Sequence, residues 1–184
     1  MNPALCYIAI IADDETCSLV KALQQTAADN FDSSRALRSP PHITLEPPFK
    51  WNPKDLQALE SQLQLFAAQQ KPFSIRLRGF NKFPSRVIFL DVEDNQQLQR
   101  LQNNLKIHLR AVFNLVSERP DRPFRPHMTV AFKDLRKNRF SEAWEYFSRI
   151  EFHRVFDAEK ITLLQHDGQR WQQRCSFVMK GRQP

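Results

Sequence analysis

Two short segments of the same pattern, His-Ile-Thr at 42–44 and His-Met-Thr at 127–129, constrain the fold of this chain most. Each follows a proline and runs into apolar residues, as in a buried strand. With five His and five Thr in 184 residues, chance predicts roughly 0.14 His-x-Thr tripeptides. Side chains i and i+2 of a strand point to the same side, so each segment presents an imidazole and a hydroxyl together. The pair predicts a duplicated architecture with half of a functional site on each copy.

The surrounding residues repeat the order strand, helix, loop, His-x-Thr strand, helix, strand at an offset of 85 residues (127 minus 42). Apolar periodicity and turn residues give the boundaries. In the first half we expect a strand at 5–13, a helix at 15–30, a loop at 31–41, a strand at 42–46 ended by Pro47 and Pro48, a helix that begins with Asn52 and Pro53, and a strand from Phe73.

The second half follows the same reasoning and adds a terminal hairpin. We expect a loop at 80–85, a strand at 86–92, a helix capped by Asp94 with an apolar face that ends at Val112, the strand at 127, a helix at 138–150, and two strands at 152–165 and 170–179 joined by a turn at Asp167-Gly168.

These elements predict an α+β fold with two pseudo-symmetric lobes, each an antiparallel sheet with helices packed outside. We expect residues 1–184 to form a single domain, with the two His-x-Thr strands facing a central cleft. A chain of this length can bury roughly 70% of its unfolded surface, which is enough for a substantial core.

The composition indicates which partners the protein favours and in which cellular compartment it lies. Lys and Arg exceed Asp and Glu by 27 to 20, for a net charge of +7. This favours polyanionic partners, although an ordinary solvated surface explains the charge equally well. Three cysteines, Cys6, Cys17 and Cys175, lack metal-ligand spacing and a preceding signal segment, so we expect reduced thiols and a cytoplasmic protein. No run reaches the ~20 apolar residues that a membrane span requires.

Two imidazoles beside a substrate suit phosphate-ester chemistry. One neutral ring accepts a proton from the nucleophile while one protonated ring gives a proton to the leaving oxygen. The hydroxyls of Thr44 and Thr129 can stabilise the charge that builds on the other phosphate oxygens. The catalytic candidates are therefore His42, Thr44, His127 and Thr129, and the sequence leaves open which histidine is acid and which is base.

Histidines also have other roles in proteins. A metal site would need carboxylates or thiols at ligand spacing, and neither tripeptide has them, so we expect no metal and no cofactor. A half-buried structural role is the ordinary explanation for a single strand histidine. We expect His108, His153 and His166 to be structural or exposed, because none of them is followed by Thr two residues later.

These residues resemble the 2H phosphoesterase superfamily, in particular the bacterial RNA 2′,3′-cyclic phosphodiesterases also called 2′-5′ RNA ligases. The resemblance covers nearly the whole chain: the N-terminal strand, His42-x-Thr44, the strand in FPSRVIFLDV, and RPFRPHMTV. It implies that His42 and His127 are the catalytic pair, that Thr44 and Thr129 bind phosphate, and that a 2′,3′-cyclic phosphate is opened to a 2′-phosphate without metal.

The expected partner is RNA or a nucleotide with a cyclic phosphate, bound by a monomer. Two further readings stay open: ligation at 2′-5′ linkages, which reverses the same chemistry, and a nucleic-acid end-binding protein with little turnover. The candidates for phosphate contacts are Arg122, Arg125 and Lys133, and those for stacking on a base are Phe49, Phe83 and Phe124. For each of these, a structural role in the loop that carries it is the alternative.

Overall fold

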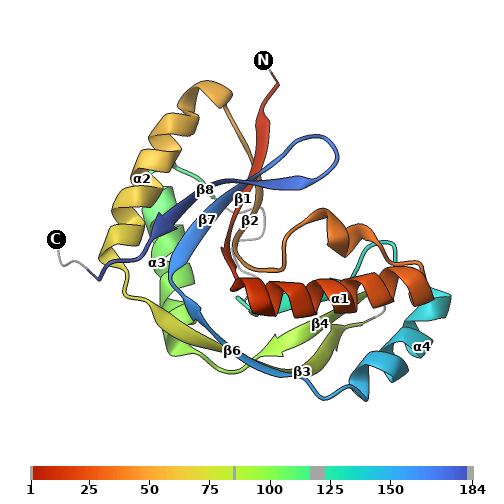
Figure 1. Ribbon diagram of the computed structural model, residues 1–184. Coiled ribbons are helices and arrows are strands. Elements are labelled where there is room, and N and C mark those ends of the chain that lie inside the picture. Colours follow the sequence, from red (N-terminus) through yellow and green to blue (C-terminus); the bar gives the residue numbers. More distant parts are fainter. Residues whose placement is uncertain (1, 85, 117–122, 182–184) are drawn as a thin grey trace.

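The computed structural model describes residues 2–84, 86–116 and 123–181 (Figure 1). Helices and strands alternate through most of the chain, as expected. The described elements are β1 (Ala4–Ile11), α1 (Asp14–Phe31), the 3-10 helix η1 (Arg35–Arg38), β2 (His42–Trp51), the 3-10 helix η2 (Pro53–Asp55), α2 (Leu56–Gln69), β3 (Phe73–Phe83), β4 (Val87–Val92), α3 (Gln96–Phe113), β5 (His127–Ala131), α4 (Lys137–Ser148), β6 (His153–Ala158), β7 (Lys160–His166) and β8 (Trp171–Val178).

The strands form one antiparallel sheet in the order β6-β3-β4-β5-β2-β1-β7-β8. We call β2, β1, β7 and β8 lobe one, and β5, β4, β3 and β6 lobe two. The predicted α+β class with two antiparallel lobes is confirmed. The sheets of the two lobes are continuous, because β2 pairs with β5. The His-x-Thr strands therefore lie side by side at the centre of the sheet.

Two of the helices pack on the lobe opposite to the one that holds the strand before them. Helix α1 follows β1 of lobe one and packs on β5 of lobe two, whereas α3 follows β4 of lobe two and packs on β2 of lobe one. Helix α2 covers β7 and β8, and α4 covers β3 (Figure 1). Each lobe is thus covered by helices from both halves of the sequence.

One main core lies between the helices and one face of the sheet. Ile43 and Leu45 of β2 and Met128 and Val130 of β5 are buried in it. A separate small cluster, Tyr7, Ala9 and Leu164, lies outside that core. Because side chains alternate along a strand, it belongs to the opposite face, which we call the open face.

The helix boundaries follow the predicted chemistry with two differences. The side chain of Asn95, not Asp94, accepts the hydrogen bond from the N–H of Leu98 and caps α3. Asn95 has the extended backbone that a cap needs and lies next to the first helical residue. Val112 is 44% exposed, so the buried face of α3 ends at Leu109.

Strand β2 does not end at Pro47 and Pro48, as predicted, but continues to Trp51. The two prolines have no N–H to offer a neighbouring strand. In the pairing with β1, Ile8 lies opposite Glu46 and Cys6 lies opposite Phe49, so the two prolines together face the single residue between them. This bulge lets β2 pass through a proline pair.

Two other strand predictions were wrong in their boundaries. Residues 80–83 belong to β3, because Gly79 adopts φ +65° at an irregularity in the pairing with β4 and the strand then continues. The expected strand at 152–165 is divided at Glu159. Its first part, β6, pairs with β3 at the edge of lobe two, and its second part, β7, pairs with β1 in lobe one. The chain thus runs from one lobe to the other, which shows how strongly the sheet curls (Figure 1).

Candidate active site

The two His-x-Thr segments are adjacent in the sheet. Ile43 pairs with Met128 in antiparallel register. Continued by one residue in each direction, this register puts His42 opposite Thr129 and Thr44 opposite His127. Ile43 and Met128 are buried in the core, so the four polar side chains point to the open face. The structure brings together all four residues that the sequence singled out.

This register sets the spacing of the two imidazoles. Directly opposed residues have Cβ atoms about 4.5–5.5 Å apart, and diagonal neighbours are about 7–8 Å apart. His42 and His127 are diagonal neighbours, and the charge of His127 acts on the His42 ring. The two imidazoles therefore lie on either side of the Ile43–Met128 pair, on the same face of the sheet as the two threonines.

Both imidazoles are oriented by the same local device. Nδ1 of His42 donates to the carbonyl of Pro40 at 2.7 Å, and Nδ1 of His127 donates to the carbonyl of Arg125 at 2.8 Å. A carbonyl can only accept, so Nδ1 carries the proton in each ring and Nε2 is the atom that takes up or gives up a proton. Proline precedes each histidine, and it fixes φ in the backbone between the histidine and the carbonyl that its ring binds.

His42 is the more enclosed of the two rings. Burial lowers its pKa to about 4, the bond to the Pro40 carbonyl opposes this shift, and the charge of His127 adds to it. The ring of Tyr7 lies 4.9 Å from the His42 ring. The Tyr7 hydroxyl is 2.5 Å from Oγ of Ser39, which lies 3.4 Å from Nδ1 of His42. His42 is thus neutral near pH 7.

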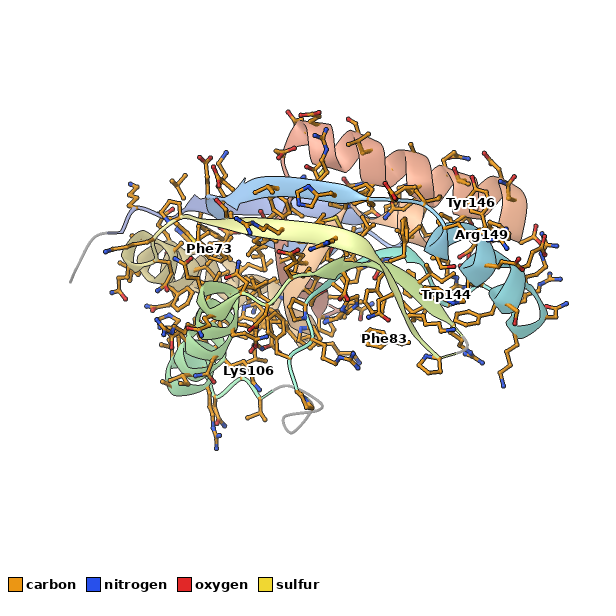
Figure 2. The ribbon with its side chains drawn as sticks, turned by 90° about the horizontal axis from the view of Figure 1, so that it is seen from below. Phe73, Phe83, Lys106, Trp144, Tyr146 and Arg149 are labelled. Atoms are coloured by element: carbon orange, nitrogen blue, oxygen red, sulfur yellow. The ribbon has the colours of Figure 1, made fainter. Side chains whose placement is uncertain are left out.

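His127 has aromatic neighbours from lobe two. The rings of Phe83 and Phe89 each lie 5.0 Å from the His127 ring. The guanidinium of Arg125 lies 5.3 Å from the centre of the Phe83 ring. Phe83 and α1 lie on opposite sides of β3 and β4 in Figure 2, which agrees with a position on the open face.

A pocket of about 250 Å³ adjoins this aromatic group. Its wall combines aromatic rings with hydrogen-bonding groups. The lining residues are Phe83, Phe89, Asp91, Val92, Asp94, Gln99, Phe124, Arg125 and Pro126.

Glutamines from the covering helices support the two strands at the centre. Among the described residues β2 and β5 are paired at Ile43 and Met128, and two carbonyls near this pair accept hydrogen bonds from helix side chains. Nε2 of Gln24 on α1 donates to the carbonyl of Thr129 at 2.9 Å, and Nε2 of Gln102 on α3 donates to the carbonyl of Leu45 at 3.2 Å.

The other predicted contact residues are scattered. Arg125 and Phe83 lie beside His127, as described, whereas Phe124 lines the adjoining pocket and packs against the main core. Lys133 lies just after β5 and has φ +63°, in the left-handed region. Phe49 packs against the main core and lies 5.8 Å from the Trp51 ring, so it is turned away from the open face. Arg122 lies outside the described residues.

Three open-face side chains were missed by the sequence reasoning: Tyr7, His166 and Trp171. Tyr7 was only one apolar residue of a buried strand, and His166 was expected to be structural or exposed. The rings of Tyr7 and Trp171 are 4.5 Å apart, and those of His166 and Trp171 are 4.9 Å apart. No local pattern could reveal this cluster, because β1 and β7 become neighbours only in the folded sheet.

The remaining features bear on other kinds of site. Cys6, Cys17 and Cys175 are free thiols, the first two buried. Across the described ranges, no three His, Cys, Asp or Glu side chains gather as metal ligands would. No helix formed by the described residues has the length and apolar character that crossing a bilayer requires.

Comparison with known proteins yields relatives over most of the chain. A protein of Geobacillus kaustophilus, whose name proposes a phosphoesterase activity, is 28% identical over 156 residues, 83% of this chain and 86% of the relative. A similarly named protein of Geobacillus thermodenitrificans is 30% identical over 159 residues, with the same coverage.

Solved structures share the fold. The protein TT0787 of Thermus thermophilus superposes with a TM-score of 0.72 at 20% identity, over 97% of this chain and all of that one (100%). E. coli LigT complexed with 3′-AMP superposes with a TM-score of 0.69 at 18% identity, over 96% and 98% of the two chains. The family model described as the 2′-5′ RNA ligase superfamily matches residues 12–170. With a match of this length on a shared fold, the chain belongs to the 2′-5′ RNA ligase superfamily.

Proposed function

We propose that this protein is a cyclic phosphodiesterase that opens 2′,3′-cyclic phosphates at RNA ends or on nucleotides, with His42 and His127 as the proton-transfer pair. The observation that carries the proposal is the matched geometry of the two histidines. They lie on adjacent strands, on the same face, and each Nδ1 is bound to the carbonyl two residues before it. Superfamily membership supports a phosphoesterase.

The different surroundings of the two rings suggest their roles. His42 is neutral near pH 7, because burial lowers its pKa to about 4. We assign it the base, which can accept a proton without first losing one. His127 is then the acid. Water attacks phosphorus and gives a proton to Nε2 of His42, the bond to the 3′ oxygen breaks, and that oxygen takes the proton from Nε2 of His127. The phosphate stays on the 2′ oxygen.

The threonines act on the phosphate oxygens that do not leave. Their hydroxyls alternate with the two imidazoles in the register described above, so Thr44 and Thr129 can donate to these oxygens from two sides. Negative charge increases there in the transition state, and fixed donors stabilise it. No metal is needed for these steps, since two imidazoles supply both proton transfers.

The nucleotide that carries the cyclic phosphate is assigned to the pocket beside His127. Phe83, which the Arg125 guanidinium covers, and Phe124 both line this pocket, and a base that enters it would contact their rings. A base can stack on such rings. E. coli LigT was solved with 3′-AMP, which supports a nucleotide as the ligand of this fold. Lys133 remains a candidate for contacts to more distant phosphates of an RNA chain.

Two alternatives share the same site. Ligation at 2′-5′ linkages uses a nucleoside hydroxyl in place of water, and the name of the superfamily favours it. An end-binding protein with little turnover would need cationic contacts but not two oriented imidazoles, so the paired Nδ1 bonds favour an enzyme.

The test is turnover of nucleoside 2′,3′-cyclic phosphates and of cyclic-phosphate-ended RNA in excess EDTA. We expect hydrolysis to persist and to yield a 2′-phosphate, identified by phosphorus NMR. Activity that is lost on chelation and restored by a divalent ion would contradict the two-histidine mechanism, and a 3′-phosphate product would reverse the orientation of the substrate.

A further inference from the structure

The pocket beside His127 contains two carboxylates, which is unexpected next to a site for a phosphate ester. Asp91 and Asp94 line its wall together with aromatic rings and Arg125. Like charges repel, so a carboxylate that faces a phosphate group weakens the binding of that group. Each carboxylate must therefore be held by the protein or face an uncharged part of the ligand.

Asp91 is held by the protein. It lies directly opposite His127 in the pairing of β4 with β5, and Oδ2 of Asp91 accepts from Nδ2 of Asn81 at 3.0 Å. The Arg125 guanidinium lies 5.3 Å from the centre of the Phe83 ring, which is 5.0 Å from the His127 ring. The end of the pocket next to His127 thus has a cation as well as a hydrogen-bonded carboxylate, so it can adjoin a phosphate.

Asp94 has different surroundings. It follows three residues after Asp91, beyond the end of β4, and therefore lies up to about 10 Å farther along the chain. Its side chain is exposed and does not cap α3, because Asn95 does. Among the residues that the structure describes, the Asp94 carboxylate has no hydrogen-bond or ion-pair partner. It is therefore available to a ligand.

The end of the pocket at Asp94 presents hydrogen-bonding groups of both kinds. Gln99, near the start of α3, is half-buried and lines the pocket with Asp94. The Gln99 amide can donate, whereas the carboxylate can only accept. With the cyclic phosphate at His127, a base in the pocket points its outer edge, the one opposite to the ribose, toward these two side chains. They can therefore distinguish bases by that edge.

The four bases differ in what this edge offers to a carboxylate. Guanine alone has two N–H donors side by side, at N1 and N2, with the O6 acceptor next to them. Adenine and cytosine place a ring nitrogen acceptor beside their amino group, and uracil places a carbonyl on each side of its one N–H. The two oxygens of a carboxylate accept both guanine donors at once, whereas with each other base one oxygen meets an acceptor.

We propose that Asp94 makes this pocket selective for guanine: its carboxylate accepts from N1 and N2 of the base, and the Gln99 amide donates to O6. This inference rests on the proposed function and narrows its substrates to those whose cyclic phosphate is on guanosine. A few placed polar groups among apolar rings are the usual source of ligand specificity. The exposure of Asp94 limits the effect, since water competes for an exposed carboxylate.

The test compares two ligands that differ in one amino group. Guanosine 2′-phosphate and inosine 2′-phosphate, which lacks N2, are titrated calorimetrically into the wild-type protein, so that binding is measured without turnover. Because Asp94 is exposed, we expect the lower part of the usual range for a bidentate contact to a base edge. Guanosine 2′-phosphate should bind about 5- to 20-fold more tightly, equivalent to about 1–1.8 kcal/mol. Asp94→Asn should remove most of this ratio.

Glu93→Gln is the matched control, because it removes the same charge from the neighbouring residue, whose carboxylate pairs with Arg76 and Arg78. Loss of a negative charge raises the affinity for any anionic nucleotide, so the decisive quantity is the ratio of the two affinities. Glu93→Gln should leave this ratio unchanged.

Three results would overturn the proposal: equal affinities of the wild-type protein for the two ligands, no binding of either, or a ratio that survives Asp94→Asn in a protein that melts normally. Hydrolysis of guanosine 2′,3′-cyclic phosphate by the wild-type protein is measured separately. If hydrolysis is absent while the ratio behaves as expected, the proposed function fails and the guanine selectivity stands. Hydrolysis with equal affinities gives the reverse.

Discussion

At the scale of residues, the site depends on two imidazoles with the same sequence context and different surroundings. The backbone gives both the same tautomer through the carbonyl two positions earlier. Burial then distinguishes His42, because it lowers the pKa of this ring to about 4. Pairs of titrating groups with unlike environments are how a site acts as acid and base at one pH.

We expect His42→Ala and His127→Ala each to lower kcat by about 10²–10⁴-fold, the usual contribution of a positioned proton-transfer group. The double variant should be scarcely worse than either single one, because the groups act as a unit. A diester with an activated aryl leaving group needs no acid, so it should restore much of the rate of His127→Ala and little of that of His42→Ala. Rescue of His42→Ala instead would exchange the two roles.

The pH dependence follows from the lowered pKa of His42. The base is active when neutral, so kcat/KM should fall as the pH drops through about 4, well below the value near 6.5 of an ordinary histidine. Above that pH the rate should stay level until the acid loses its proton. The pH–rate profile checks this. His153→Ala is the control for another histidine as the source of the acidic limb. If kcat/KM fell on the acidic side with a midpoint near pH 6.5 in both the wild-type protein and this variant, the effect of burial on the pKa of His42 would be contradicted.

At the scale of elements, the described sheet has its fewest strand-to-strand pairs at its centre, between β2 and β5. In the part of the chain that the structure describes, β2 and β5 are paired at Ile43 and Met128, and glutamines from α1 and α3 donate to carbonyls near this pair. The helices therefore hold the two His-x-Thr strands by polar contacts as well as by the apolar core. The hydrogen bonds of the first helical turn help to hold α3 in this position.

Asn95→Ala should destabilise the protein by about 1–2 kcal/mol, because the side chain caps α3 through the N–H of Leu98 and also donates to the carbonyl of Ser74. Asp94→Ala is the matched control. Its side chain does not cap the helix, so we expect a change within about 0.5 kcal/mol. Urea unfolding of both variants decides between the cap seen in the structure and the one predicted from sequence.

At the scale of the whole molecule, lobe two also holds the segment that leads into His42. The carboxylate of Asp134, just after β5, accepts from Oγ of Ser33 at 3.0 Å and from the N–H groups of Ser34 and Arg35 at 2.9 Å each. These bonds join the exit of one His-x-Thr strand to the entrance of the other. They tie the position of His42 to the lobe that contains His127.

Asp134→Ala should therefore lower stability by about 2–3 kcal/mol, since several hydrogen bonds to one carboxylate are lost, and should also lower kcat/KM. Asp29→Ala provides the comparison, because that exposed carboxylate accepts from Gln25 of its own helix and so joins no distant segments. Denaturant unfolding and cyclic-phosphate turnover are measured on both. Equal behaviour of the two variants would mean that Asp134 does not tie the lobes together.

Local patterns could predict most elements of this fold and the four residues at its centre. Apolar periodicity located the buried faces of α2 and α3, and the spacing within each tripeptide placed His and Thr on one face. Long-range pairing could not be read in this way. The bulge at Pro47 and Pro48 requires β1 opposite, and the contact between Tyr7 and Trp171 requires β1 and β8 on either side of β7.

The side-by-side placement of the two copies within one chain has a further consequence. In an assembly of two identical halves, both imidazoles would have the same neighbours and would titrate alike. Here each copy has acquired its own surroundings: Tyr7 and Ser39 beside one ring, Phe83 and Arg125 beside the other. If the proposed function is right, joining the halves in one chain is what lets a nearly symmetric frame act differently on the two ends of one phosphate ester.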